Sequence, residues 1–320
     1  MNQSYKLAII KKISFLLLFG GSCFAQTDSI SNLYHKKYDD KISVQVFALN
    51  TSNSFTIQYA KEKLDVEMLP NLKTTFNLGV QYDIIAFSFG FASEILAENK
   101  DNKGAKMRTF SFTALPGRWM QRVDYYYQKG ITLKSPENSV YFQRLKTLKL
   151  GGNTSYFFNK RFSYAATSFQ NAKQLKSAGT FAAMLSYYYT EINGENEPDI
   201  GENSYFFNVA LSPTYYYNWV IGKNFLVSGG FSFGAGATVN TSEHKSSTIA
   251  MVQASSLVSL GYNSDRFYGG INNKILVSSH EETSNVTIDD TMNYSTIFVG
   301  YRFDAPSFLE REKQRIKKHF

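Results

Sequence analysis

The chain has 320 residues, of which 27 are Phe, 22 are Tyr and 2 are Trp, and it carries a formal charge of +8. Three positive charges lie in the first twelve residues and a net three in the last eleven. The part between is therefore only mildly basic, at about +2, which excludes a nucleic-acid-binding footprint. The single cysteine, Cys23, excludes a disulfide framework.

Residues 1–25 have the features of an export signal. Three lysines precede a short apolar core, and residues 23–25 (CFA) form a small-x-Ala cleavage site. The core is far shorter than the ~20 residues of a membrane-spanning helix. The alternative is a lipoprotein signal with Cys23 lipidated, but Gly20 stands where that signal needs an aliphatic residue. We expect residues 1–25 to be removed and residues 26–40 to form a periplasmic N-terminal segment.

From residue 41 onward the dominant pattern is alternation. "FNLGVQY" at 76–82 and "IAFSFGF" at 85–91 each place aromatic and aliphatic residues on one face and small or polar residues on the other. Many such segments exceed the usual five or six residues of a strand. A sheet with an apolar outside and a polar inside must close on itself in a bilayer. The pattern therefore predicts an all-β transmembrane antiparallel barrel over residues 41–303.

Connections of two lengths alternate along this region. Short turns are expected near 83–84, 116–118, 159–161, 221–223 and 263–265, and longer external loops near 93–106, 130–145, 191–203, 241–247 and 279–290. This alternation predicts about twelve strands, within a range of 10–14. They are expected near 42–58, 73–82, 85–93, 107–115, 118–128, 146–158, 162–190, 204–218, 224–240, 248–262, 266–278 and 291–303. The last strand ends in an aromatic residue, Phe303, of the kind that the outer-membrane assembly machinery recognises.

One polar stretch interrupts the seventh strand. Residues 169–177 do not alternate, and the order of the connections leaves room for only one crossing between Arg161 and the loop at 191. We therefore expect 169–177 to leave the wall as a bulge or a short helical turn and to plug the barrel from the periplasmic side. It should lie against the small residues of 224–240, with Gln170, Gln174 and Lys176 reaching polar groups of the lumen.

Residues 304–320 form a highly charged periplasmic tail. Ser307 is placed to cap a short helix. A solvated tail is the simpler reading of so few apolar residues, and a contact with a periplasmic partner or anionic headgroups is the alternative.

The alternation also predicts which polar side chains face the lumen. If aromatic residues face lipid, four cations and one acid are among the inward set. Such a lumen favours polar or anionic solutes, and mutual bracing of Arg122 and Asp124 is the alternative. With the plug residues, the candidates are Gln45, Arg122, Asp124, Lys149, Asn153, Gln170, Gln174, Lys176, Gln253, Asn272, Lys274 and Arg302.

The sequence offers little catalytic chemistry. His244-x-Ser246 has the spacing of a serine with its activating histidine, but it falls in an expected loop, with no residue placed to orient the imidazole. Acidic groups near 191–202 and 280–290 are typical of solvated loops and lack calcium-loop spacing. We expect no catalytic residue, no metal and no cofactor. A narrow passage or binding barrel for a small polar or anionic solute is the leading hypothesis. An outer-leaflet lipid-modifying enzyme and a structural or surface-interaction barrel are the alternatives.

The segments "NKRFSYAATSFQNAKQLKSAGTF", "FNLGVQYDIIAFSFGF" and "GYNSDRFYGGI" resemble a Bacteroidetes family known as domain of unknown function, family 4421. The resemblance covers roughly residues 40 to 303. It implies a signal-bearing barrel of the outer membrane, in contact with outer-membrane lipid and lipopolysaccharide and inserted by the assembly machinery. It implies no activity, substrate or catalytic residue.

Overall fold

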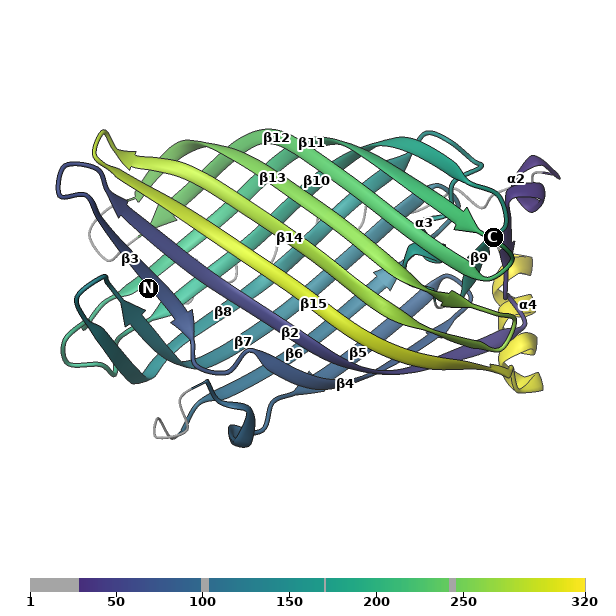
Figure 1. Ribbon diagram of the computed structural model, residues 1–320, viewed down its shortest axis with the longest axis horizontal. Coiled ribbons are helices and arrows are strands. Elements are labelled where there is room, and N and C mark those ends of the chain that lie inside the picture. Colours follow the sequence, from purple (N-terminus) through teal and green to yellow (C-terminus); the bar gives the residue numbers. More distant parts are fainter. Residues whose placement is uncertain (1–28, 99–103, 170, 242–245, 320) are drawn as a thin grey trace.

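The computed structural model describes residues 29–98, 104–169, 171–241 and 246–319, and it shows a closed antiparallel β-barrel (Figure 1). Twelve of the described strands form a continuous ring. In ring order they are β2 (Lys41–Tyr59), β4 (Thr74–Tyr82), β5 (Ile85–Phe91), β6 (Lys106–Ala114), β7 (Trp119–Lys134), β8 (Ser139–Phe157), β10 (Ala178–Asn193), β11 (Asn203–Ile221), β12 (Phe225–Thr241), β13 (Ser246–Asn263), β14 (Phe267–Thr283) and β15 (Val286–Asp304). The predicted strand count is confirmed. The expected signal at 1–25 lies outside the described residues.

The ring closes through its first and last strands. β15 pairs with β2 along its full length, from Asp304 opposite Lys41 to Val286 opposite Tyr59. Every strand is therefore paired on both sides somewhere along its length, which a sheet in hydrocarbon requires.

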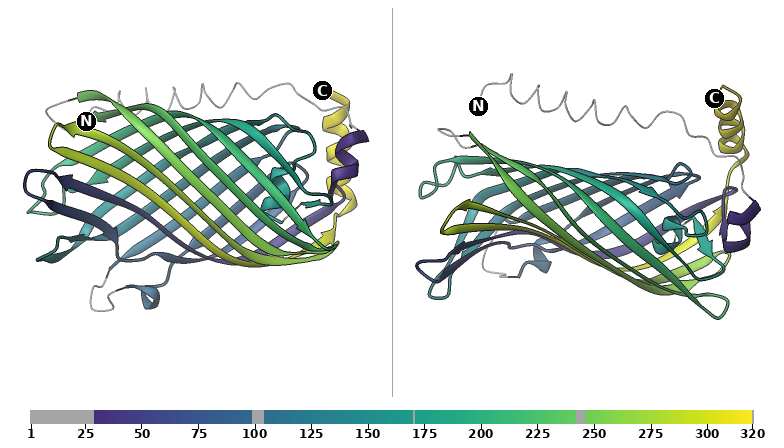
Figure 2. Two further views of the ribbon diagram at one scale, coloured as in Figure 1. Left: turned by 45° about the horizontal axis from the view of Figure 1, so that its top comes forward. Right: turned by 90° about the horizontal axis from the view of Figure 1, so that it is seen from above.

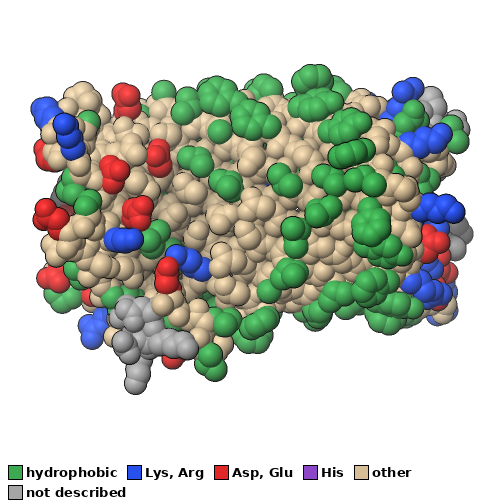
Figure 3. All heavy atoms as spheres, in the orientation of Figure 1, with side chains coloured by type: hydrophobic (Ala, Val, Ile, Leu, Met, Phe, Trp, Pro, Cys, Tyr) green, Lys and Arg blue, Asp and Glu red, His purple; other side chains and the backbone are tan. Residues whose placement is uncertain are grey.

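Alternating burial explains why the sequence folds this way. Along β4 and β5 the outward Phe76, Phe87 and Phe89 are 55%, 49% and 56% exposed, whereas the inward Asn77 is 7% exposed. Figure 3 shows such apolar side chains gathered over the half of the barrel nearer the C-terminus. In a chain with this outer surface, the lipid takes the place of a second hydrophobic layer.

Two of the expected long loops are wrong. β7 runs to Lys134 and β8 begins at Ser139, so the loop expected at 130–145 is a tight hairpin. Likewise β14 runs to Thr283 and β15 begins at Val286, so the loop expected at 279–290 is also a tight turn. The reason is that these strands keep their backbone pairing beyond the apolar surface. In the first hairpin the register shift beside Gly130 interrupts the alternation, although Ile131 is apolar and buried.

A thirteenth strand of the sheet, β3 (Leu64–Pro70), has no counterpart in the expected set. It pairs with the outer end of β2 and then with the outer end of β7. It thus bridges the rim above β4, β5 and β6, which are only seven to nine residues long. The connection from β5 to β6 contains a short 3₁₀ helix, η2 (Glu94–Leu96).

The described residues of 158–177 leave the wall between β8 and β10, which confirms the inward segment predicted at 169–177. The segment is longer than predicted, because residues 162–168, expected in the seventh strand, belong to it. It contains a helical turn, α3 (Tyr164–Thr167), and a short strand, β9 (Ala172–Gln174). The N-terminal segment, with α2 (Ser29–Tyr34) and β1 (His35–Lys37), lies against it, and β1 pairs with β9. Figure 2 shows these elements at the end of the barrel where the chain leaves β15 toward the C-terminus.

The C-terminal tail forms a helix, α4 (Ser307–His319), at the same end. Lys313 Nζ lies 3.0 Å from the Asp39 carbonyl oxygen and 3.4 Å from an Asp83 carboxylate oxygen. The helix is therefore held against both the N-terminal segment and the turn between β4 and β5. None of the helices in the described ranges is long and apolar enough to cross a bilayer.

Candidate functional site

The interior of the barrel collects the polar residues and is the candidate site. Its predicted lining residues differ in burial. Six are almost fully buried in the interior: Gln45, Asp124, Lys149, Asn153, Gln253 and Arg302. Arg122, Asn272 and Lys274 occupy inward positions of their strands and are half-buried, and Gln174 is buried in the plug. Gln170 lies outside the described residues.

An ion pair crosses the lumen in its outer half. Lys149 Nζ on β8 lies 2.7 and 2.6 Å from the two carboxylate oxygens of Asp290 on β15, and both side chains are at most 5% exposed. In the ring, five strands separate β8 from β15 in either direction. Lys149 also donates to Asn53 at 3.0 Å, and Asn208 donates to Asp290 at 3.4 Å. Opposite walls therefore meet through a hydrogen-bonded salt bridge.

An aromatic contact lies beside this ion pair. Phe55 of β2 stacks on Phe206 of β11 with ring centroids 6.0 Å apart, and Phe206 lies 6.4 Å from the ring of His280 on β14. All three side chains are buried. They join walls that are far apart in the ring, so the bore is occupied here by rings.

A second crossing layer is made of tyrosines. Tyr126 of β7 meets Tyr294 of β15 edge to face at 5.6 Å, and Tyr188 of β10 packs in the same cluster. Lys149 Nζ lies 5.4 Å from the Tyr188 ring centre, which connects this layer to the ion pair. Leu49, Leu276 and Met292 complete the cluster. The middle of the barrel is thus packed much like the core of a water-soluble protein.

Arg122 and Asp124 brace one another next to these tyrosines. The Arg122 Nε lies 2.9 Å from both Asp124 carboxylate oxygens, and the Ser111 hydroxyl donates to Asp124 at 2.5 Å. The Arg122 guanidinium also lies 6.0 Å from the Tyr294 ring centre. The charges of this pair are compensated within β6 and β7, so the lumen gains little net positive field from them.

Gln174 organises the plug layer. Its amide nitrogen donates to the carbonyl oxygens of Tyr34, Arg161 and Lys176 at 2.8–3.1 Å. Its amide oxygen accepts from the Ser163 backbone and from Asn218 of β11 at 3.0 and 3.1 Å. One side chain thus ties the plug to itself, to the N-terminal segment and to the wall.

Arg302 on β15 holds the plug against a part of the wall away from β11. It is 0% exposed, and its guanidinium lies between the rings of Tyr38 and Tyr268, at 4.1 and 4.5 Å. It donates to the Ser264 carbonyl at 2.6 Å, to Asn263 Oδ1 at 2.8 Å and to the Phe169 carbonyl. The residue therefore joins three segments, the N-terminal segment, the plug and the last turn of the wall.

The plug differs from expectation in two details. Lys176 is exposed and lies 5.6 Å from the Tyr34 ring centre, so it does not reach the lumen. The plug meets the strand of small residues near its start, where Leu226 packs with Ala166, Phe169 and Ala172, and Lys173 donates to Asn224 at 2.7 Å. Further along, the Tyr216 ring covers Gly230 and fills the space that the small residues leave.

Sequence reasoning missed the most important interior residues. Asp290 fell in an expected loop, and the inward tyrosines were assigned to lipid because they are aromatic. Their position in the alternation was a usable signal, since Tyr126 has the same parity as Arg122 and Asp124.

The candidate catalytic and metal groups remain without support. His244 lies outside the described residues, and Ser246 begins β13 with its hydroxyl 3.2 Å from that of Thr241. In the described part of the chain no three His, Cys, Asp or Glu side chains are grouped to hold a metal ion.

Comparisons with known proteins identify a family. None of the curated proteins compared with the sequence matches it. Solved structures of similar outline include the outer membrane protease OmpT from Escherichia coli, at 10% identity and TM-score 0.36 over 84% of this chain and 98% of that one. The COG4313 outer membrane channel from Pseudomonas putida F1 has 8% identity and TM-score 0.39 over 84% and 98%. The outer membrane protein OprG from Pseudomonas aeruginosa has 11% identity and TM-score 0.26 over 84% and 99%. The family model for the domain of unknown function DUF4421 matches residues 26–303, and the chain belongs to that family.

Proposed function

We propose that this chain is an outer-membrane barrel with a closed bore, which acts through its two ends and its lipid-facing wall rather than by free passage of solutes. The Lys149–Asp290 salt bridge carries the proposal, because it joins diametrically opposite strands with both partners buried. The tyrosine layer and the plug add two further obstructions below it. The outer-membrane location and the Bacteroidetes origin implied by the sequence resemblance are part of this proposal.

Energetics support a stably closed state. A buried salt bridge that loses one partner costs about 3–5 kcal/mol, because the remaining charge is stranded away from water. A solute entering from outside must separate Lys149 from Asp290 and then displace the tyrosine cluster. Twelve strands leave less room than the sixteen of an aqueous porin, so the side chains that cross the lumen fill a large share of it.

The proposal is tested by conductance. The purified full-length protein is reconstituted into planar bilayers and into liposomes, and flotation of the liposomes establishes that it has inserted. We expect no stepwise ion conductance and no swelling of liposomes in small sugars. Regular conductance steps from inserted wild-type protein would contradict a closed bore.

A narrow passage that opens on demand is the second candidate, and a specific observation favours it. Several inward side chains in the described strands have buried polar atoms without a partner in the protein, a property of hydrated interiors. They are Asn53, Gln128, Asn153, Ser155, Thr190, Ser212 and Asn272. This candidate predicts that the double variant Lys149→Met, Asp290→Leu opens more often than wild type under applied voltage. If neither wild type nor the double variant conducts ions under applied voltage, this candidate is contradicted.

A further inference from the structure

Three lysines form a row across the outer surface of β6, β7 and β8. Lys106 pairs in register with Lys129, and Lys129 pairs with Lys146. Neighbouring strands lie about 4.8 Å apart, so the three backbones span roughly 10 Å. Arg108 lies one outward position further along β6 and is exposed, as is Lys106. We call these four residues the cationic row.

The row sits at the outer edge of the apolar surface. Next to it in the periplasmic direction, the outward positions are Tyr127 on β7, Leu148 on β8 and Phe110 on β6. On β7 the outward residues from Trp119 to Tyr127 span nine positions, close to the 9–11 residues that a tilted strand needs to cross a bilayer. Lys129 therefore lies at the level of the outer-leaflet headgroups.

Such a row opposes the stability of the sheet. Like charges directly opposite each other on neighbouring strands are destabilising. Among the residues that the structure describes, none of the four cations forms an ion pair. Of the described acidic groups on this side, Glu191 on β10 accepts a hydrogen bond from Tyr189, and Glu94 lines a pocket together with Lys106 and Arg108. Binding of an anion from outside the protein would offset the repulsion between these cations.

We propose that the cationic row binds the phosphorylated headgroup of outer-leaflet lipopolysaccharide. This rests on the proposed outer-membrane location. Two lysines on adjacent strands bring their ammonium groups to one phosphate, and the Arg108 guanidinium adds two parallel donors. The apolar side chains below the row lie where the acyl chains of the same lipid run.

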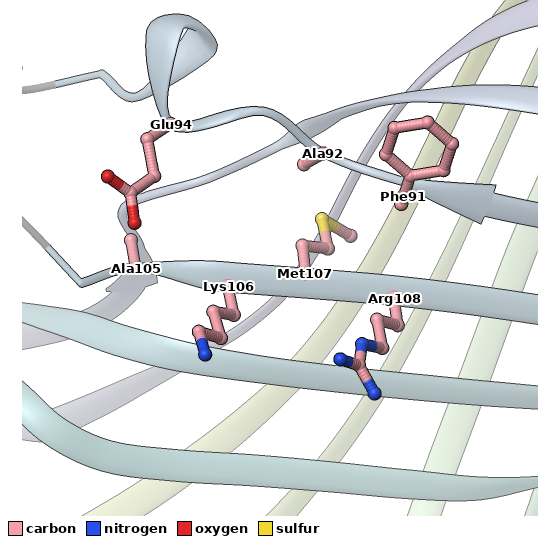
Figure 4. A pocket seen from close by; sticks show the side chains of 7 residues that line it. All are labelled: Phe91, Ala92, Glu94, Ala105, Lys106, Met107 and Arg108. Carbon is pink, nitrogen blue, oxygen red and sulfur yellow. The ribbon is translucent and has the colours of Figure 1, made fainter.

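A shallow pocket adjoins the row on β6. It has a volume of about 260 Å³ and is lined by Lys106 and Arg108 together with Phe91, Met107 and Glu94. Figure 4 shows the Lys106 and Arg108 side chains extending side by side from β6. The pocket gives the sugar ring next to the phosphate a place beside the two cations, with Glu94 as a hydroxyl acceptor.

Lipid titration of matched variants tests the site. The site variant carries Lys106→Gln, Lys129→Gln and Lys146→Gln. The control variant carries Lys61→Gln, Lys63→Gln and Lys134→Gln, three exposed lysines on the outer rim beyond the apolar surface. Each protein is refolded in detergent free of lipopolysaccharide, and its folding is checked by the mobility shift between heated and unheated samples. Binding of lipopolysaccharide, dephosphorylated lipopolysaccharide and phosphatidylglycerol is then measured by native mass spectrometry.

Loss of three charge-assisted contacts should weaken lipopolysaccharide binding by roughly tenfold or more, while the control stays within about twofold of wild type. Without lipid the site variant should unfold at the same temperature as wild type or higher, since like charges are removed. Added lipopolysaccharide should raise the unfolding temperature of wild type and of the control variant, and much less that of the site variant. Equal losses in both variants, or equal binding of the dephosphorylated lipid, would overturn the proposal. Binding of phosphatidylglycerol as tight as that of lipopolysaccharide would overturn the choice of lipid.

Localisation separates this inference from the proposed function. Density-gradient fractionation of the native membranes shows whether the full chain is in the outer membrane. An outer-membrane protein whose site variant binds lipopolysaccharide as wild type does leaves the closed barrel intact and refutes the cationic row. A chain found in another membrane refutes the proposed function and, with it, the assignment of the row to this lipid.

Discussion

Replacing Asp290 by Asn tests the salt bridge that crosses the lumen. The substitution keeps the size of the side chain but leaves Lys149 charged, 3% exposed and facing an amide. A buried charge that loses its partner costs about 3–5 kcal/mol in free energy of unfolding. Lys149→Met should cost a similar amount, because it strands the Asp290 carboxylate instead.

The double variant Lys149→Met, Asp290→Leu removes both charges and should recover most of this loss. Its remaining cost comes mainly from the Asn53 amide oxygen, which loses the donor that lay 3.0 Å away, because the Asn208 amide loses only a long contact of 3.4 Å. An unsatisfied buried acceptor costs about 1–3 kcal/mol. The double variant should therefore lie within about 3 kcal/mol of wild type, whereas the two single losses add to about 6–10 kcal/mol.

Urea-induced unfolding in detergent micelles, followed by the fluorescence of Trp119 and Trp219, measures these differences. Both indoles lie on the lipid-facing surface, at 41% and 56% exposed, and report loss of the barrel wall. The matched control is Glu98→Gln, which breaks the more exposed Lys73–Glu98 pair at 2.8 Å and should cost less than about 1 kcal/mol. Additive losses in the double variant, or a loss for Asp290→Asn no larger than that of the control, would refute the reasoning.

Two further predictions concern the interior and the plug. Gly230→Ala should lower the free energy of unfolding by about 1–3 kcal/mol, because its methyl group overlaps the Tyr216 ring, whereas Gly229→Ala next to it meets nothing within 4 Å and should be neutral. Equal effects at the two glycines in the same urea titration would contradict the packing. Burial lowers the pKa of His35 from its ordinary 6.5, so the β1–β9 pairing should be stable above pH 6.5 and weaken as the pH falls below it. Hydrogen exchange of β9, corrected for intrinsic rates, should accelerate from pH 7.5 to 5 in wild type and not in His35→Phe, and a pH-independent wild type would refute this.

The barrel was predictable from the sequence because lipid acts as a uniform solvent for one face. Every wall strand must then repeat the same alternation, as β4 and β5 do, and the strand count follows. The plug was found for the opposite reason, since residues 169–177 break the alternation where no loop fits. Its partners were not predictable, because they depend on the packing of segments far apart in sequence.

The contacts within the lumen were harder to foresee. Parity places Lys149 and Asp290 inside, but only the shear of the closed sheet brings positions 141 residues apart to the same height. The inward aromatic residues were wrongly assigned to the lipid-facing surface for a chemical reason. Tyrosine suits lipid, interface and packed interior alike, so Tyr126 and Tyr294 carry no signal of their own beyond their place in the alternation.

The position of Arg302 constrains the order in which the molecule is built. It lies two residues before the end of the last wall strand, yet it holds the backbone of Phe169, from the middle of the chain, and packs on Tyr38, from the beginning. A side chain with no exposed surface does not thread into a finished cylinder. We infer that the middle segment already occupies the cavity when the final strand joins the first, so that closure of the wall also seals its contents.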